Sequence, residues 1–272
     1  MKAEGTARRT IVEVPKPAKR MRRNQHFVLL GSCFAQYMGE RFLAEGMDAV
    51  CNPLGAAYNP ESIAIQVRQS LLSDGPLPVF QFDGKWRCWW ANTLLSDTDE
   101  ARFRTTIGDT FRLLGEALRH ADYLFVTLGT NVCYRLKAGG MTVANCHKVP
   151  AREFEEVTLP LSVCIDTLSG MMELLRRECP RTQVVFTVSP YRYKKYGLHG
   201  SQLAKATLLL AVDELCKRFP ETASYFPAYE IMLDELRDYR YFADDMIHPA
   251  PNAVEHIWNR FKAGIDDAQT GP

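Results

Sequence analysis

The chain has 272 residues, of which 46% are apolar and 24% charged, and its formal net charge is +1 at pH 7. This length and composition predict a globular protein with a substantial core. No stretch approaches the uninterrupted apolar run of a membrane-spanning helix, and no apolar stretch of signal-peptide length precedes Pro15. We therefore expect a cytoplasmic protein without a membrane function.

Apolar spacing along the chain predicts strands that alternate with helices. The first strand, at 27–31, leads through Gly31-Ser32 into a helix at 34–46, where Gly46 is a natural stop. The elements expected after it are a strand at 48–51, a helix at 62–72, a hairpin or elaborated insertion within 73–109, a helix near 110–121, a strand at 123–131, an irregular stretch at 132–158, a helix at about 160–178, a strand at 182–190, a helix at about 201–218, and a terminal helix from about 251.

The strands are continuous apolar runs, not alternating ones. A strand that is buried on both faces loses its alternation, so this pattern predicts a mainly parallel sheet covered by helices on both sides. The expected fold class is a three-layer α/β/α domain with insertions, and such sheets bind ligands at the carboxyl ends of their strands. We find no internal repeat and no low-complexity linker, which favours one domain over two.

Positive charge is concentrated at the N-terminus. Residues 1–23 contain eight Lys or Arg and two Glu, so the remaining residues carry a net charge of about −5. A short basic segment of this kind is more often a solvated arm than a contact for nucleic acid or membrane. We expect a basic tail at 1–23, a single domain at 24–272, and neither a nucleic-acid nor a membrane partner.

The cysteines indicate reduced thiols. Eight of them stand singly, without a C-x-x-C pair, at positions 33, 51, 88, 133, 146, 164, 179 and 216. A disulfide framework or a structural zinc site would show paired cysteines at short spacing. We therefore expect mostly buried free thiols and no metal site.

Polar residues gather where the predicted strands end. Ser32 follows the first strand, Gly55 follows the second, Asn131 follows the strand at 123–131, and Asp245 and His248 share one late loop. Parallel strands carry their ends to one rim of the sheet, so these residues are expected to meet there. A serine, a histidine with a carboxylate to orient it, and additional hydrogen-bond donors are the set that nucleophilic acyl transfer requires.

The order and spacing of these residues resemble the SGNH or GDSL-type hydrolases. That superfamily has a Ser after the first strand, a Gly after the second, a G-x-N block and a late D-x-x-H. More narrowly, "GSCFA" at 31–35 is similar to the signature of the GSCFA family. The segments that share this resemblance are "NPLGAAYNPESI" (52–63), "LGTNVCY" (128–134), "NCHKVP" (145–150), "TVSPYR" (187–192), "KATLLLA" (205–211) and "FPAYEIMLDELRDYRYFADDMIHP" (226–249).

The resemblance implies a flavodoxin-like, SGNH-hydrolase-like fold and a set of roles. Ser32 would attack an acyl carbonyl, His248 would accept its proton, and Asp245 would fix the imidazole tautomer. The backbone N–H groups of Ser32 and Gly55 and the side-chain amide of Asn131 would hold the oxyanion. Alternatively, Gly55 has no part in the oxyanion hole and only forms a turn.

Cys33 competes with Ser32 as the nucleophile, because a thiolate is intrinsically more reactive and a helix start favours it. Adjacent residues on a tight turn point in different directions, so only one of the two is expected to face His248. The family pattern assigns that place to Ser32. We expect Cys33 to pack against the first helix or the sheet.

Two further side chains are candidates for substrate binding. His147 lies in an irregular insertion and either lines the pocket or is structural, while Arg192 follows a strand and either pairs with an anionic substrate group or holds an acidic residue of 234–240. The pair Trp89-Trp90 is either a sugar-stacking platform or buried packing. No cofactor is implied.

We therefore expect a serine hydrolase of carboxylic esters, such as O-acyl groups on carbohydrate or on another small hydroxylated compound. An O-acyltransferase would use the same three residues, with an acceptor alcohol in place of water. A binding module that kept the fold without turnover is a further alternative. The sequence does not indicate an oligomeric state.

Overall fold

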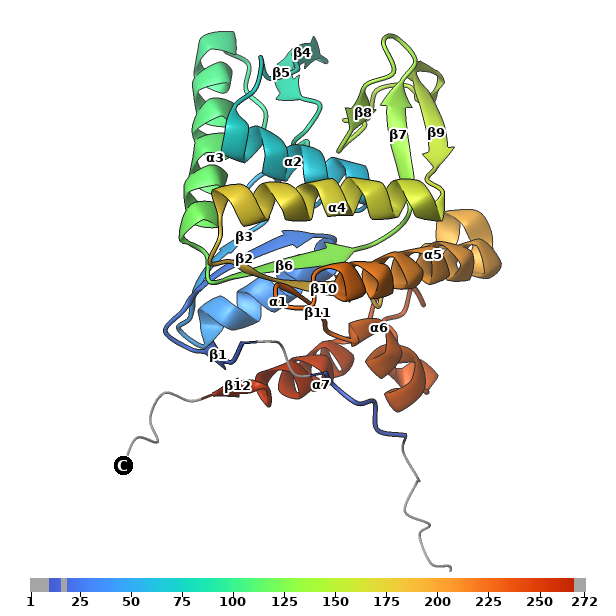
Figure 1. Cartoon of the computed structure of the whole chain (residues 1–272). Coiled ribbons are helices and arrows are strands. Elements are labelled where there is room, and N and C mark those ends of the chain that lie inside the picture. The colour runs from blue at the N-terminus through green and yellow to red at the C-terminus, as the bar shows by residue number, and fades with distance from the viewer. Residues whose placement is uncertain (1–9, 16–18, 267–272) are drawn as a thin grey trace, which may run out of the picture.

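A parallel five-stranded sheet organises the structure, a computed structural model that describes residues 10–15 and 19–266 (Figure 1). The strands lie in the order β11-β10-β6-β2-β3. Their bounds are β2 (His26–Gly31), β3 (Asp48–Cys51), β6 (Tyr123–Leu128), β10 (Gln183–Val188) and β11 (Ala223–Tyr225). Counted along the chain, this is the 2-1-3-4-5 order of flavodoxin-like doubly wound sheets, so the expected fold class is confirmed.

Helices cover both faces of this sheet. Their bounds are α1 (Cys33–Ala44), α2 (Pro60–Leu72), α3 (Glu100–His120), α4 (Leu161–Glu178), α5 (Gly197–Arg218), α6 (Ala228–Glu230) and α7 (Pro251–Lys262), with short turns η1 (Ala151–Glu153), η2 (Lys194–Tyr196), η3 (Ile231–Glu235) and η4 (Tyr239–Tyr241). Figure 1 shows α2, α3 and α4 above the sheet and α7 below it.

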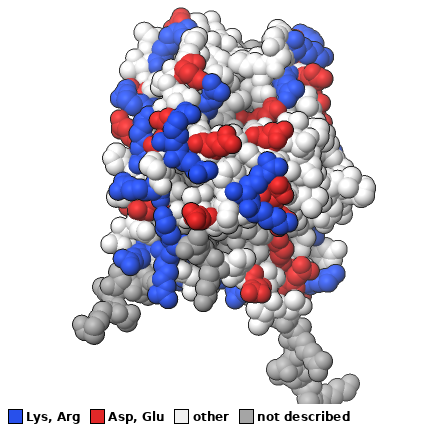
Figure 2. Space-filling view, viewed as in Figure 1, with Lys and Arg blue, Asp and Glu red and all other residues white. Residues whose placement is uncertain are grey.

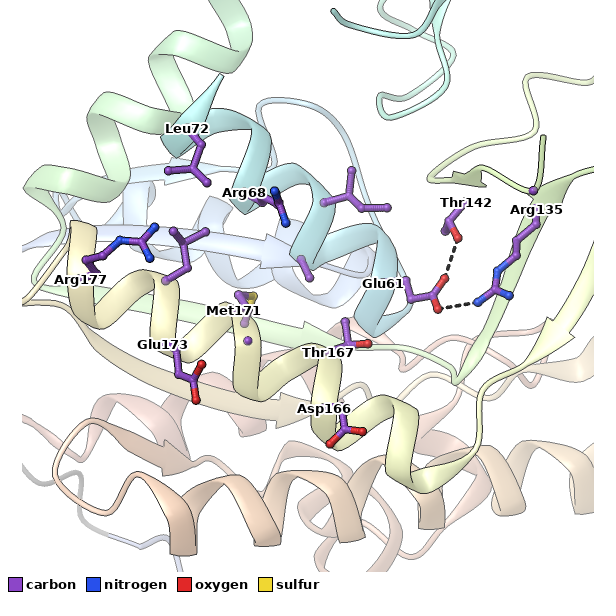
Figure 3. Close-up of a pocket in the computed structure, with 15 residues that line it drawn as sticks. Glu61, Arg68, Leu72, Arg135, Thr142, Asp166, Thr167, Met171, Glu173 and Arg177 are labelled. Atoms are coloured by element: carbon purple, nitrogen blue, oxygen red, sulfur yellow. Dashed lines mark hydrogen bonds and ion pairs between the residues drawn. The ribbon is translucent and has the colours of Figure 1, made fainter. Parts of the chain in front are cut away.

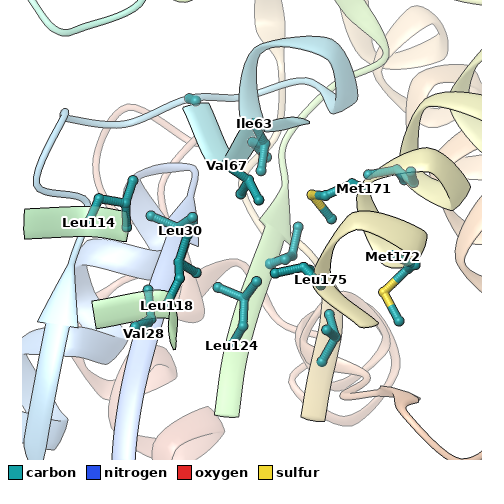
Figure 4. Close-up of a cluster of buried hydrophobic side chains, with 14 of the residues drawn as sticks. Val28, Leu30, Ile63, Val67, Leu114, Leu118, Leu124, Met171, Met172 and Leu175 are labelled. Atoms are coloured by element: carbon teal, nitrogen blue, oxygen red, sulfur yellow. The ribbon is translucent and has the colours of Figure 1, made fainter. Parts of the chain in front are cut away.

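Successive residues along a strand point alternately into two separate hydrophobic cores, one on each face of the sheet. Val28 and Leu30 of β2 pack with α2, α3, α4 and α5, and Figure 4 shows this cluster. Phe27 and Leu29 of the same strand face α1 and α7 on the other side, where aromatic rings dominate. Burial on both faces explains why the strand sequences are continuously apolar.

Helix α3 begins about ten residues before the start expected from the sequence. Asp99 caps it, since its carboxylate accepts from the backbone N–H of Arg102 at 2.7 Å. Phe103 and Ile107 extend the buried stripe of the helix toward its N-terminus. The expected boundary was wrong because β-branched residues and Gly108 weaken the helical pattern of this first half.

Two insertions carry small antiparallel sheets. The predicted hairpin within 73–109 is present as β4 (Val79–Phe82) and β5 (Lys85–Cys88). The stretch 132–158 was expected to be irregular, but it forms a sheet in the order β8-β7-β9, from β7 (Val132–Leu136), β8 (Thr142–Val143) and β9 (Phe154–Thr158). These strands are short and amphipathic, so they leave little periodic signal in the sequence.

Part of the basic N-terminal segment packs on the domain. β1 (Met21–Arg22) pairs in parallel with β12 (Ile265–Asp266), and Met21 is buried in the aromatic core. The backbone N–H of Val12 donates to Glu235 at 3.1 Å. Val12 and Met21 therefore tie parts of the tail predicted for 1–23 to the domain, while most of the described side chains of this segment are exposed. Residues 1–9 and 16–18 lie outside the described part.

Surface charge is mixed in sign. Figure 2 shows Lys and Arg interspersed with Asp and Glu over the visible face, without a broad patch of one sign. Across residues 10–15 and 19–266, no helix combines the length and the hydropathy that crossing a bilayer would require.

Gly31 closes β2 against β6, and we expect it to be intolerant of a side chain. Its φ is +127°, and a Cβ would lie 2.1 Å from the carbonyl oxygen of Thr127. Gly31→Ala should therefore lower the free energy of unfolding by about 3 kcal/mol or more. Urea denaturation measures this loss.

Gly46→Ala is the matched control. Gly46 also has a positive φ, +74°, but open space surrounds the place of its Cβ. The strain alone should cost about 1–2 kcal/mol. Equal losses in the two variants would contradict the argument that close approach of β2 and β6 makes glycine necessary at position 31.

Candidate active site

Ser32 stands at the exit of β2 and caps α1. Its Oγ accepts from the backbone N–H of Phe34 at 3.3 Å, and its own N–H donates to the carbonyl oxygen of Thr127 at 3.0 Å. The residue is only 2% exposed. The side chain therefore lies at the junction between β2 and β6, where the strand order of the sheet reverses and ligands bind in folds of this type.

His248 and Asp245 form a hydrogen-bonded pair in the loop before α7. One carboxylate oxygen of Asp245 accepts from Nδ1 of His248, and the other accepts the backbone N–H groups of Ile247 and His248 at 2.8 and 3.0 Å. Those backbone donors, with the imidazole, lower the pKa of Asp245 to about 2. The ring of Tyr191 meets the imidazole edge-on, with centroids 4.7 Å apart.

One pocket of about 510 Å³ joins these two sides. Ser32, Arg192 and His248 all line it, so the structure brings three of the predicted site residues together. Asp245 is hydrogen-bonded to His248 but does not itself line this pocket. Among the described residues, no hydrogen bond joins the Ser32 hydroxyl to the His248 imidazole. The Oγ atom accepts from the N–H of Phe34.

The three predicted oxyanion donors are occupied by carbonyl groups. Besides the bond from the N–H of Ser32 to Thr127, the N–H of Gly55 donates to the Asn52 carbonyl at 2.7 Å. The side-chain amide of Asn131 donates to the Leu159 carbonyl at 2.9 Å. Gly55 and Asn131 are also not among the residues that line the pocket.

His147 lies apart from the pocket, packed against the β4–β5 hairpin. It is 1% exposed, with Nε2 2.9 Å from the Cys88 carbonyl oxygen and Nδ1 3.2 Å from Oγ1 of Thr93. Burial lowers the pKa of its imidazole to about 4, so the ring is neutral at pH 7. The structure gives it a packing position, and its neighbours Asn145 and Cys146 line the pocket instead.

Arg192 and the tryptophan pair find different surroundings. The guanidinium of Arg192 lies 3.8 Å from the ring centroid of Phe242 and donates to the Met246 carbonyl at 3.4 Å. Trp89 stacks on Phe80 with a centroid separation of 3.6 Å. Neither tryptophan of the pair lines the pocket, and both pack within the insertions.

Cys33 was expected to pack inside the protein, but it lines the pocket beside Ser32 and is partly exposed. Its Sγ lies 3.1 Å from the hydroxyl of Tyr58. As the first residue of α1, it leaves the turn on the side that opens to the pocket. Within the described ranges, no three His, Cys, Asp or Glu side chains gather closely enough to hold a metal ion.

Lys205 is the pocket residue that sequence reasoning missed. It lies in α5, is 1% exposed, and lines the same pocket as Ser32. Its sequence signal was a lysine on the helix face that otherwise carries the buried residues Ala204, Leu208 and Val212. A lysine side chain is almost never fully buried unless it is paired.

Some solved structures resemble this fold at low sequence identity. A protein described as a GDSL-like lipase from Parabacteroides merdae is 9% identical, with a TM-score of 0.49 over 92% of this chain and 98% of that chain. A family 3 carbohydrate esterase from Talaromyces cellulolyticus is 9% identical, with a TM-score of 0.42 over 88% and 95%. Identities of this size leave the chemistry of this chain to be argued from its own residues.

The sequence itself has a clear family assignment. No curated protein matches the chain significantly. The GSCFA family model, however, matches residues 26–261, which span the whole five-stranded sheet and the helices that cover it, except the last residue of α7. The chain belongs to the GSCFA family.

Proposed function

We propose that this protein is a serine-dependent hydrolase of carboxylic esters, with Ser32 as nucleophile, His248 as general base and Asp245 as the residue that orients it. The observation that carries the proposal is that Ser32 and a His248 already paired with Asp245 line one pocket at the reversal point of the sheet. Tyrosines 58, 134, 191 and 193 line the pocket too. Their rings and hydroxyls suit a small hydroxylated substrate, such as an O-acylated carbohydrate.

The reaction follows from these groups. Nε2 of His248 takes the proton of the Ser32 hydroxyl while Oγ bonds to the acyl carbon, and Asp245 stabilises the resulting imidazolium through Nδ1. The C–O bond to the alcohol then breaks, and the alcohol leaves with the proton from His248. Water next attacks the acyl-enzyme by the same route, which releases the acid and restores Ser32.

Catalysis requires small rearrangements of the resting structure. The Ser32 hydroxyl must come within hydrogen-bond reach of His248, and a rotation that breaks its cap on the N–H of Phe34 would cost about 1 kcal/mol. Ser32, Gly55 and Asn131 stay the predicted oxyanion donors, and the first two would have to exchange their present carbonyl acceptors for the oxyanion. Asn131 carries a second amide hydrogen. Contacts of this kind often tighten only when substrate binds.

Solvent access favours hydrolysis over acyl transfer. The side chains of His248 and Asp245 are 45% and 44% exposed. A transferase must keep water from the acyl-enzyme, which requires a closed pocket around the general base. An imidazole this open admits water as the second nucleophile, so we propose an esterase before a transferase.

Ser32→Ala should abolish turnover of a chromogenic acetyl ester. Loss of the nucleophile typically lowers kcat by about 10³-fold or more, because no acyl-enzyme forms. Labelling by a fluorophosphonate probe should disappear in the same variant. Peptide mass spectrometry of the labelled wild-type protein should find the adduct on Ser32.

Cys33→Ala is the matched control, since Cys33 is adjacent and lines the same pocket. This variant should keep labelling and most of its turnover. If Cys33→Ala lost turnover while Ser32→Ala kept it, the thiol and not the hydroxyl would be the nucleophile.

The Asp245 carboxylate should titrate well below its ordinary pKa of about 3.9. Because its pKa in the folded protein is lowered to about 2, its bonds stabilise the loop above about pH 4 and are lost as the pH falls toward 2. Carboxyl ¹³C NMR should show a midpoint near pH 2. His248→Ala should keep most of this lowering, because backbone N–H groups are its largest cause. A midpoint near the ordinary value would contradict the loop geometry.

A further inference from the structure

Lys205 places a buried ammonium group at the strand exits that hold the candidate nucleophile. Its Nζ donates to the carbonyl oxygen of Gly129 at 2.6 Å, and Gly129 directly follows β6. Ser32 follows the neighbouring strand β2, and all three residues line the same pocket. The ammonium therefore lies beside the space in which an ester would react.

No carboxylate pairs with Lys205 anywhere in the described ranges. Its contacts are the Gly129 carbonyl and the ring of Tyr229, whose centroid lies 5.9 Å from Nζ. Burial without a counter-charge is unfavourable, and it lowers the pKa of Lys205 to about 7. A polar carbonyl alone does not neutralise the charge, so the protonated form of Lys205 has no counter-charge in the resting structure.

The other charged side chains around the pocket have the same sign. Arg192, Lys194 and Lys195 line it as well, and none of the described lining residues is Asp or Glu. Lys195 is neutralised by an ion pair with Glu156. Within the described residues, the guanidinium of Arg192 contacts a ring face and a backbone carbonyl, neither of which cancels its charge.

A second hollow shows what a balanced lining looks like. The groove between α2 and α4 is shown in Figure 3, and the charged residues that line it are Glu61, Asp166, Glu173, Arg68, Arg135 and Arg177. There Glu61 accepts from Arg135 at 2.7 Å and from Thr142 at 2.6 Å. That groove is lined by three acidic and three basic side chains, whereas the charged residues that line the pocket at Ser32 are all basic.

From this arrangement we infer that the ester substrate carries an anionic group, which pairs with the Lys205 ammonium inside the pocket while Arg192 adds positive charge beside it. The inference rests on the proposed ester hydrolysis and names the class of ester. A carboxylate or a phosphate would supply the counter-charge that the protein lacks, through charge-assisted hydrogen bonds. The structural alternative is that Lys205 only ties α5 to the Gly129 carbonyl, and this alternative predicts no preference for charged substrates.

Three matched acetyl esters test the inference at constant ionic strength. They are 4-acetoxybenzoate, 4-acetoxyphenyl phosphate and the neutral methyl 4-acetoxybenzoate. At least one anionic ester should exceed the neutral one in kcat/KM by about tenfold or more, mainly through a lower KM. The better of the two anionic esters distinguishes carboxylate from phosphate.

Single-residue variants test which side chain causes the preference for anionic esters. Lys205→Met keeps most of the length of the side chain without its charge. It should lower kcat/KM for the anionic ester far more than for the neutral ester, so that the preference disappears. Lys217→Met, at the exposed end of the same helix where Lys217 pairs with Asp213, should keep the preference. If Lys205→Met does not fold, Arg192→Gln provides the second test, with a preference reduced several-fold.

Binding to Ser32→Ala separates this inference from the proposed function. Calorimetry with 4-hydroxybenzoate, 4-hydroxyphenyl phosphate and methyl 4-hydroxybenzoate needs no turnover. Selective binding of an anion without any esterase activity of the wild-type protein would overturn the proposed hydrolysis and keep the anion site. Ester hydrolysis with no preference for charge, and no selective anion binding, would overturn the inference and keep the hydrolase.

Discussion

The close contact between the ends of β2 and β6 is the constraint on which the site depends. The N–H of Gly31 donates to the side chain of Asn52 at 2.9 Å, and its carbonyl accepts from Ala57 at 3.0 Å. The N–H of Ser32 then bonds to Thr127 across the reversal point of the sheet. Only a residue without a Cβ allows the two strands this approach. The contact fixes where the chain leaves β2, and thereby where residue 32 lies.

The pocket lies between a buried side and a solvent-exposed side. Strand ends and α5 hold Ser32 and Lys205, both nearly fully buried. The opposite side is a loop in which Asp245 uses its backbone hydrogen bonds to present His248, and that side is about half exposed. This division places Ser32 and Lys205 inside the pocket and leaves the His248 imidazole open to solvent.

Much of the architecture could be predicted from the sequence, because strands buried on both faces and amphipathic helices leave strong patterns. Asp245 and His248 lie close together in one loop, so their pairing could be predicted from their spacing in the sequence. The sheet at 132–158 left no such pattern, because its strands are short. The place of Lys205 depends on how α5 packs against β6 and β10, and the sequence does not determine that contact locally. The orientation of Cys33 depends on the turn geometry at Ser32 in the same way.

We propose that Ser32 and His248 act together across the pocket. A crystal structure of the protein after reaction with a fluorophosphonate tests this most directly. We expect a covalent bond from phosphorus to Oγ of Ser32, with Nε2 of His248 within about 2.6–3.2 Å of an oxygen of the adduct. An adduct on Cys33, or a His248 imidazole that stays turned away from an adduct on Ser32, would contradict it.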